Sequence, residues 1–162
     1  MVNDRLRIYT YPAVTMLKKI CHEVDIFDQN LANFVQRMKN TLGHSKGIGL
    51  AANQVGDNRR ILVMKIPGKG GFKKSSKPSR YTLINPVITW HSDNMVSSGE
   101  SCLSFPGIRC KINRYEAISI VATDIIGVER YTYEFDGLAA RCVQHEIDHL
   151  NGITIETKGK WV

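Results

Sequence analysis

This chain of 162 residues lacks the long apolar runs and the apolar leader that mark membrane and secreted proteins. No stretch approaches the roughly 20 consecutive apolar residues that cross a bilayer. The N-terminal stretch MVNDRLRIYTYPAV carries charges where a signal peptide has its apolar region. The sequence therefore predicts a cytoplasmic protein with no membrane partner.

Cysteine is scarce, with only Cys21, Cys102, Cys110 and Cys142 in the whole chain. Disulfides are disfavoured in the cytosol, so a thiol near histidines is better explained as a metal ligand or a nucleophile. Counting does not decide which cysteine has such a role. For Cys102 taken alone, a buried structural thiol is the more common explanation.

Acidic residues are outnumbered, with 15 Asp and Glu against 22 Lys and Arg, giving a formal net charge of +7. The densest basic segment is GKGGFKKSSKPSR, residues 68–80, which is also rich in Gly, Ser and Pro. That composition is typical of a flexible, solvated connection between two strands. A secondary attraction to RNA or to a ribosome surface is the alternative.

The length fits one domain, 1–162, and the apolar periodicity predicts an α+β fold. Residues 28–42 have apolar side chains at helical spacing, with Asp28 as N-cap and Gly43 as a stop. Strands are predicted at 60–66, 81–90, 116–124 and 129–135. The last two are joined by a tight turn.

A second helix is predicted from Asp136-Gly137 to Leu150. One of its faces carries Leu138, Cys142, His145 and His149, and another carries Ala139, Val143, Ile147 and Leu150. A helix that is apolar on two sides is buried. We therefore expect mostly antiparallel strands packed around this central helix, together with the N-terminal helix.

The stretch CVQHEIDHLNG, residues 142–152, places His145 and His149 four residues apart on one helical face. Imidazoles at this spacing are close enough to share a metal ion. Glu146 lies about 100° away around the helix and is better placed to act on a water than to bind metal. The alternative is a pair of core histidines beside an unrelated glutamate. Because only 13 residues follow His149, a third ligand is expected upstream.

Two upstream segments have small and turn-forming residues that suit a close approach of backbone to a ligand: GIGLAANQVG (47–56) and SGESCLSFPG (98–107). The first lacks the Gly-Lys-Ser/Thr ending of a phosphate-binding loop. We expect a loop there, in which the Gln54 amide can donate to a developing oxyanion.

Together, GIGLAANQ, ESCLS and QHEIDH resemble the three signature motifs of the peptide deformylase family, in the same order and at compatible separations. The resemblance implies that Cys102, His145 and His149 bind a metal ion and leave a fourth position for water. It also implies that Glu146 is the general acid and base. Members of this family remove the formyl group from the N-terminal formyl-methionine of newly made proteins. Their metal is typically Fe(II), and zinc, nickel or cobalt can replace it.

The resemblance assigns further roles by motif position. Gln54 and the backbone N–H of Leu103 match the groups that stabilise the oxyanion. The methionine pocket is implied to include Ile48, Gly49, Leu138 and Cys142, with Gly47 supporting it and Arg109 near the peptide backbone. Glu100 and Arg114 match a pair that supports the cysteine loop. Ordinary core packing or a surface ion pair is the alternative for each pocket or supporting residue.

The sequence departs from the family pattern at three places. Ser101 stands where the motif commonly has glycine, and Arg141 stands at a usually apolar position. The Arg141 side chain could narrow the methionine pocket, contact the substrate, or extend away from it. The chain ends at TIETKGKWV without the C-terminal helix that helps bacterial members dock on the ribosome. This departure leaves a ribosome partner open but puts docking through such a helix in question. Short forms of this kind occur in phage-encoded and some other divergent members, so we expect a bacterial-type cytosol, or a host cytosol if the protein is phage-encoded.

Three hypotheses follow from the sequence. The first is an active deformylase of N-formylmethionyl nascent peptides. The second is a metal-dependent amidohydrolase of other N-acylated peptides, with Arg141 redirecting specificity. The third is an inactive, metal-holding module that binds RNA or the ribosome. All the residues that the chemistry needs are present, which favours the enzyme, and no direct nucleic-acid function is expected.

Overall fold

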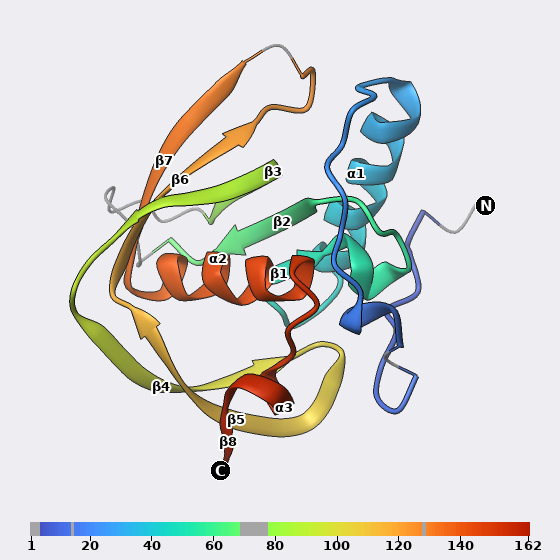
Figure 1. The fold of residues 1–162 in the computed structure, drawn as a ribbon. Helices are drawn as coiled ribbons and strands as arrows, with labels where there is room; N and C mark the ends of the chain where they lie inside the picture. Colours follow the sequence, from blue (N-terminus) through green and yellow to red (C-terminus); the bar gives the residue numbers. More distant parts are fainter. Residues whose placement is uncertain (1–3, 14, 69–77, 128) are drawn as a thin grey trace.

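The computed structural model describes residues 4–13, 15–68, 78–127 and 129–162 (Figure 1). Most of the predicted basic connection, residues 69–77, lies outside these ranges. Within the described residues, no helix combines the length and apolar character needed to cross a membrane. The fold consists of two antiparallel sheets and a few helices, as the sequence predicts.

The larger sheet has the strand order β1-β2-β3-β6-β7. Its strands are β1 (Gly49–Ala51), β2 (Ile61–Ile66), β3 (Ser79–His91), β6 (Ala117–Thr123) and β7 (Arg130–Asp136). The smaller sheet, β4-β5-β8, is formed by β4 (Met95–Cys102), β5 (Phe105–Tyr115) and β8 (Lys160–Trp161). The helices are α1 (Gln29–Gly43), α2 (Gly137–Leu150) and the single-turn α3 (Ile155–Lys158), with 3-10 turns η1 (Thr15–Lys18) and η2 (Ala52–Val55).

Both predicted helices and all four predicted strands are confirmed, with ends within two residues of the predicted ones. The α1 helix begins after Asp28, whose carboxylate accepts a hydrogen bond from the Leu31 N–H at 2.8 Å. This bond satisfies one of the free N–H groups of the first turn. The α2 helix ends at Leu150, with Asn151 as its C-cap.

The structure differs from the local sequence pattern in two places. The segment expected to form a loop contains β1, which pairs with β2 from Gly49↔Met64 to Ala51↔Leu62. The β4–β5 hairpin is absent from the predicted strands, because MVSSGESC is polar and has little intrinsic strand preference. This strand is stabilised by its pairing with β5, which runs from Met95↔Tyr115 to Ser101↔Arg109.

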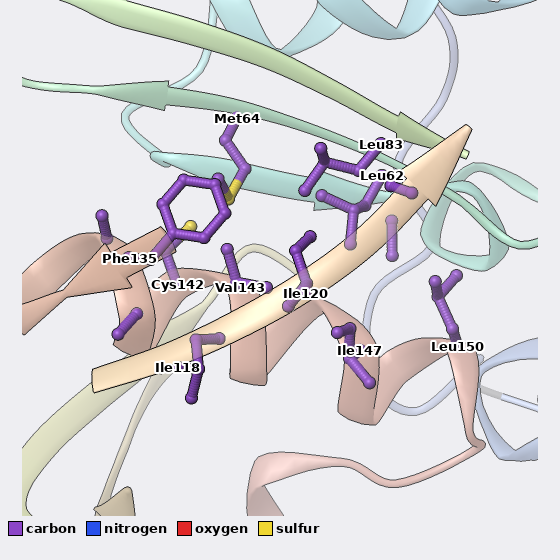
Figure 2. Close-up of a cluster of buried hydrophobic side chains, with 14 of the residues drawn as sticks. Leu62, Met64, Leu83, Ile118, Ile120, Phe135, Cys142, Val143, Ile147 and Leu150 are labelled. Carbon is purple, nitrogen blue, oxygen red and sulfur yellow. The ribbon is translucent and has the colours of Figure 1, made fainter. Parts of the chain in front are cut away.

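The main core lies between α2 and the larger sheet (Figure 2). Its buried side chains include Leu62, Met64, Leu83, Ile118, Ile120 and Phe135 from the strands, and Cys142, Val143, Ile147 and Leu150 from the helix. A second cluster packs α1 on the other side of β2, through Ile61 and Val63. Successive β2 residues therefore enter different cores, because strand side chains alternate between faces.

The α2 helix also contacts β5 of the smaller sheet. Figure 1 shows it between the larger sheet and the β4–β5 hairpin. The histidines on α2 are thereby brought beside Cys102 at the end of β4. This arrangement positions the candidate site.

Candidate metal centre and active site

Cys102, His145 and His149 converge although the cysteine is more than 40 residues away from the histidines in the sequence. One potential ligand atom from each side chain lies within 4.8 Å of the others. The Cys102 Sγ is 3.1 Å from the His149 Nε2, and the two imidazole rings meet edge-on with centroids 4.9 Å apart. All three residues are buried.

Local structure explains how each side chain reaches this point. His145 and His149 are one turn apart in α2, so their rings lie on the same helical face. Cys102 is the last residue of β4, where the pairing with β5 shifts register and Cys102 comes opposite Phe105. Glu100 and Cys102 are two residues apart in β4, so both side chains lie on the strand face that is buried against α2.

The donor set fits a divalent transition metal. One thiolate and two imidazoles are ligands that zinc and iron accept, and three protein ligands leave a position for water or substrate. The Nδ1 atom of His145 is bonded to the Glu100 carboxylate at 2.8 Å. An ionised carboxylate only accepts, so Nδ1 donates and Nε2 keeps a lone pair for a metal. The Nδ1 of His149 has no hydrogen-bond partner among the described residues.

Glu100 is buried and accepts hydrogen bonds from three side chains. Arg114 donates through Nε and Nη2, both at 2.9 Å, and Arg141 donates through Nη1 at 2.7 Å. Burial raises the pKa of this carboxyl, but the Arg114 and His145 hydrogen bonds outweigh burial and hold the pKa well below its usual range. Glu100 is therefore an anion at neutral pH.

Glu146 is buried beside the three candidate ligands, and its Oε2 atom has no hydrogen-bond partner among the described residues. Burial raises the pKa of Glu146 to about 7. Space around it is tight, because a Cβ built on Gly49 would lie 2.8 Å from both the Glu146 Cδ and the Cys142 Sγ. Glycine at this position allows the carboxylate to occupy its place.

The Gln54 amide is held at both ends. Its Oε1 accepts from the Ala51 N–H at 2.8 Å, so its orientation is fixed. Its Nε2 lies 3.1 Å from the Ser104 Oγ and 3.5 Å from the Cys102 Sγ. The donor end of the amide therefore lies beside the candidate ligand Cys102, and the next residue, Leu103, also lines the cavity.

A cavity of about 340 Å³ opens over these groups. Its lining includes the sequence-predicted residues Gly47, Ile48, Gly49, Gln54, Glu100, Cys102, Leu103, Leu138, Arg141, Cys142, His145 and Glu146. His149 and Arg114 lie behind this surface, each no more than 2% exposed. The lining combines apolar side chains with a few polar groups, as small-molecule sites do.

The role of Arg109 near the peptide backbone stays a prediction, and the structure specifies the surroundings of both Arg109 and Arg141. Arg109 is exposed and is not part of the cavity lining; its guanidinium lies beside Gly99, where an added Cβ would be 2.9 Å from Nη2. Arg141 lines the cavity, but it neither extends into solvent nor stands free to narrow the pocket. Its guanidinium is bonded to Glu100 and to the backbone of both hairpin strands.

Sequence reasoning also missed several residues. Lys46 and Gly99 line the cavity, together with Ser101, which the sequence marked only as a departure from the motif. Asp148 accepts hydrogen bonds from Arg114 and from Lys158, and Asn53 donates to the His149 carbonyl at 2.6 Å. Asp148 lies between the two histidines of HEIDH, and this position was the one sequence signal that it belongs to the hydrogen-bond network around the site.

Comparison with known proteins agrees with these motifs. The profile of the family described as "Polypeptide deformylase" matches residues 5–159. Peptide deformylase 1B, chloroplastic/mitochondrial, of Arabidopsis thaliana is 40% identical over 91% of this chain, which spans about half (52%) of that relative's length. A peptide deformylase of Helicobacter hepaticus is also 40% identical, over 94% of this chain and 82% of its own length.

The fold agrees as well. The crystal structure of peptide deformylase from Thermotoga maritima superposes with a TM-score of 0.86 at 35% identity. The match covers 96% of this chain and 98% of that one. The family match over nearly the whole chain, with the observed convergence of its three motifs, leads to one conclusion. The chain belongs to the polypeptide deformylase family.

Proposed function

We propose that this protein is a metal-dependent hydrolase that removes the formyl group from N-formylmethionyl peptides and releases formate. The observation that carries the proposal is the convergence of Cys102, His145 and His149 next to a cavity of about 340 Å³ that Glu146 lines. The family match supports the same reaction. Alternative roles, on other N-acyl groups or as an inactive binding module, have no observation that favours them.

Cys102, His145 and His149 would hold one divalent ion. The thiolate donates more charge than a third imidazole, which suits Fe(II), and zinc, nickel or cobalt are compatible with the same donors. When bound, the ion supplies Lewis acidity and lowers the pKa of a water in the site. A ferrous ion with a thiolate ligand requires a reducing compartment, which supports a cytoplasmic location.

The residues around these ligands supply the proton transfers and the oxyanion contacts. Glu146 takes a proton from the attacking water and later gives it to the departing amine nitrogen. The Gln54 Nε2 and the Leu103 N–H donate to the formyl oxygen as negative charge grows on it. Because Gln54 is already fixed by Ala51, little reorganisation accompanies this step.

Specificity for methionine is assigned to the apolar part of the cavity. Ile48, Leu138 and Cys142 line it, and Gly49 brings the β1 backbone close to Glu146. A flexible, unbranched side chain of methionine size fits an apolar pocket of this kind. N-formylmethionyl nascent peptides are the proposed substrate.

We also infer that α2 is the central element of one catalytic domain. Support comes from its contacts with both sheets, from its ten buried residues, and from the family match over residues 5–159. This one helix then carries both histidine ligands, His145 and His149, and the proposed acid and base, Glu146.

The test is formate release from a short formyl-methionyl peptide, with protein prepared without oxygen and loaded with iron or nickel. The matched control is the acetyl-methionyl peptide of the same sequence. The proposal predicts rapid release of formate and little or no release of acetate. Faster cleavage of the acetyl peptide would assign the site to another acyl group.

A further inference from the structure

Arg141 makes three hydrogen bonds that a substrate-binding role does not explain. Its Nη1 donates to the Glu100 Oε1 at 2.7 Å and to the Ile112 carbonyl at 3.1 Å. Its Nη2 donates to the Val96 carbonyl at 2.6 Å. Val96 lies in β4 and Ile112 in β5, so one guanidinium from α2 joins both strands of the hairpin.

The Glu100 carboxylate receives donors on both of its oxygens. Oε1 accepts from the Arg114 Nε and the Arg141 Nη1, and Oε2 accepts from the Arg114 Nη2 and the His145 Nδ1. Arg141 and His145 are four residues apart, one turn of α2, and each binds a different oxygen of this carboxylate. Arg114 comes from β5 and pairs with both Glu100 and Asp148 of α2, whereas Arg141 is itself a residue of α2 and binds Glu100 directly.

We propose that Arg141 is a positioning residue for the metal centre. It holds Glu100 and the β4–β5 hairpin against α2, so that Cys102, two residues beyond Glu100, keeps a fixed distance from His145 and His149. The same contact aligns Glu100 for its hydrogen bond with His145 Nδ1. The inference rests on the proposed function only in placing a metal at Cys102, His145 and His149.

This role differs from a substrate contact in what it predicts. Carboxylates that orient metal-binding histidines are held in place by their own hydrogen-bond partners, and loss of such outer contacts typically lowers metal affinity or activity by about 10- to 100-fold. Loss of a substrate contact would instead raise KM and leave metal affinity unchanged. Metal affinity can be measured without any turnover.

The experiment is chelator competition for Co(II) with the wild-type protein and with Arg141→Leu. The leucine variant keeps an apolar stem but loses all three hydrogen bonds. We expect its metal affinity to fall by about 10-fold or more. The visible absorption of bound Co(II) should change as the ligands lose their fixed geometry, and KM for the formyl-methionyl peptide at saturating metal should stay at the wild-type value.

Arg130→Leu, at an exposed β7 position, is the matched control and should bind Co(II) like the wild type.

A second variant covers a failure of Arg141→Leu to fold. Arg141→Lys keeps the charge, but one ammonium cannot reach Glu100, Ile112 and Val96 in the geometry of the planar guanidinium. Its affinity for Co(II) should lie between those of the wild type and Arg141→Leu. Wild-type affinity in a folded Arg141→Leu protein, or in Arg141→Lys if only that variant folds, would overturn the proposal. Failure of the deformylase reaction would be seen separately, in the wild-type protein itself.

Discussion

Gly49 and Glu146 occupy adjoining space: a Cβ on Gly49 would lie 2.8 Å from the Glu146 Cδ, closer than real Cβ contacts come. Gly49 belongs to β1 of the larger sheet and Glu146 to α2. The glycine therefore sets how close the sheet edge approaches the proposed proton carrier. This close approach links the first and third sequence motifs.

Gly49→Ala should displace the Glu146 carboxylate and lower kcat, while the metal ligands keep their contacts. We expect a loss of about 100-fold, because small misplacement of a reacting group has effects of that size. Gly43→Ala is the matched control, since a Cβ at Gly43 meets nothing within 4 Å. Unchanged kcat in Gly49→Ala would show that the carboxylate can act from another position.

Glu146→Ala should keep its metal and lose formate release. General acid–base catalysis contributes about 100- to 10,000-fold, so kcat should fall within that range. The measurement pairs metal content by atomic spectroscopy with the rate of formate release. Near-wild-type turnover with full metal content would remove Glu146 from the mechanism.

Cys102→Ser should weaken metal retention sharply, because a serine hydroxyl is a poor substitute for a thiolate toward iron or zinc. Metal content after gel filtration in the presence of a chelator measures the effect. Cys110→Ala is the control: Cys110 is a buried thiol of the same hairpin but not part of the three-residue group. Equal metal content in Cys102→Ser and the wild type would mean that another residue is the third ligand.

The N-cap of α1 gives a pH dependence that is independent of the site. The Leu31 N–H donates to Asp28 and lowers the pKa of this carboxyl. A lowered folded-state pKa stabilises the fold above the unfolded-state pKa, about 3.9, and this stability is lost as the pH falls through the folded-state value. The difference in unfolding free energy between the wild type and Asp28→Asn should be constant from pH 6 to 8 and change in favour of the asparagine variant below about pH 4. A constant difference down to pH 2 would contradict the assigned cap.

The hydrophobic periodicity of the sequence was sufficient to predict those helices and strands whose own residues favour one secondary structure. The α2 helix is apolar on two sides, and β6 and β7 alternate with turn residues between them. Their helix or strand character is therefore readable locally. The β4–β5 hairpin is different, since β4 is polar and depends on pairing with a strand that follows it. The residues of β4 alone therefore do not reveal that it pairs with β5.

The candidate site divides along the same line. The spacing of His145 and His149 predicts a metal site from the sequence alone. Cys102 could be assigned only through the family resemblance, because its closeness to the two histidines depends on the β4–β5 hairpin. Arg141 shows the limit most clearly. Its partners Glu100, Val96 and Ile112 are 41, 45 and 29 residues away in the sequence, so the helical wheel placed its backbone but not its guanidinium. Long-range ion pairs of this kind require the tertiary structure.

The central claim is that one metal ion bound beside Glu146 makes this chain a deformylase. The most direct measurement is formate released per bound metal from a formyl-methionyl peptide, with anaerobically prepared, nickel-loaded protein that contains one ion per chain. The account predicts many turnovers per ion, and their loss when the metal is removed by a chelator. Fully metallated, folded protein that releases no formate would contradict it.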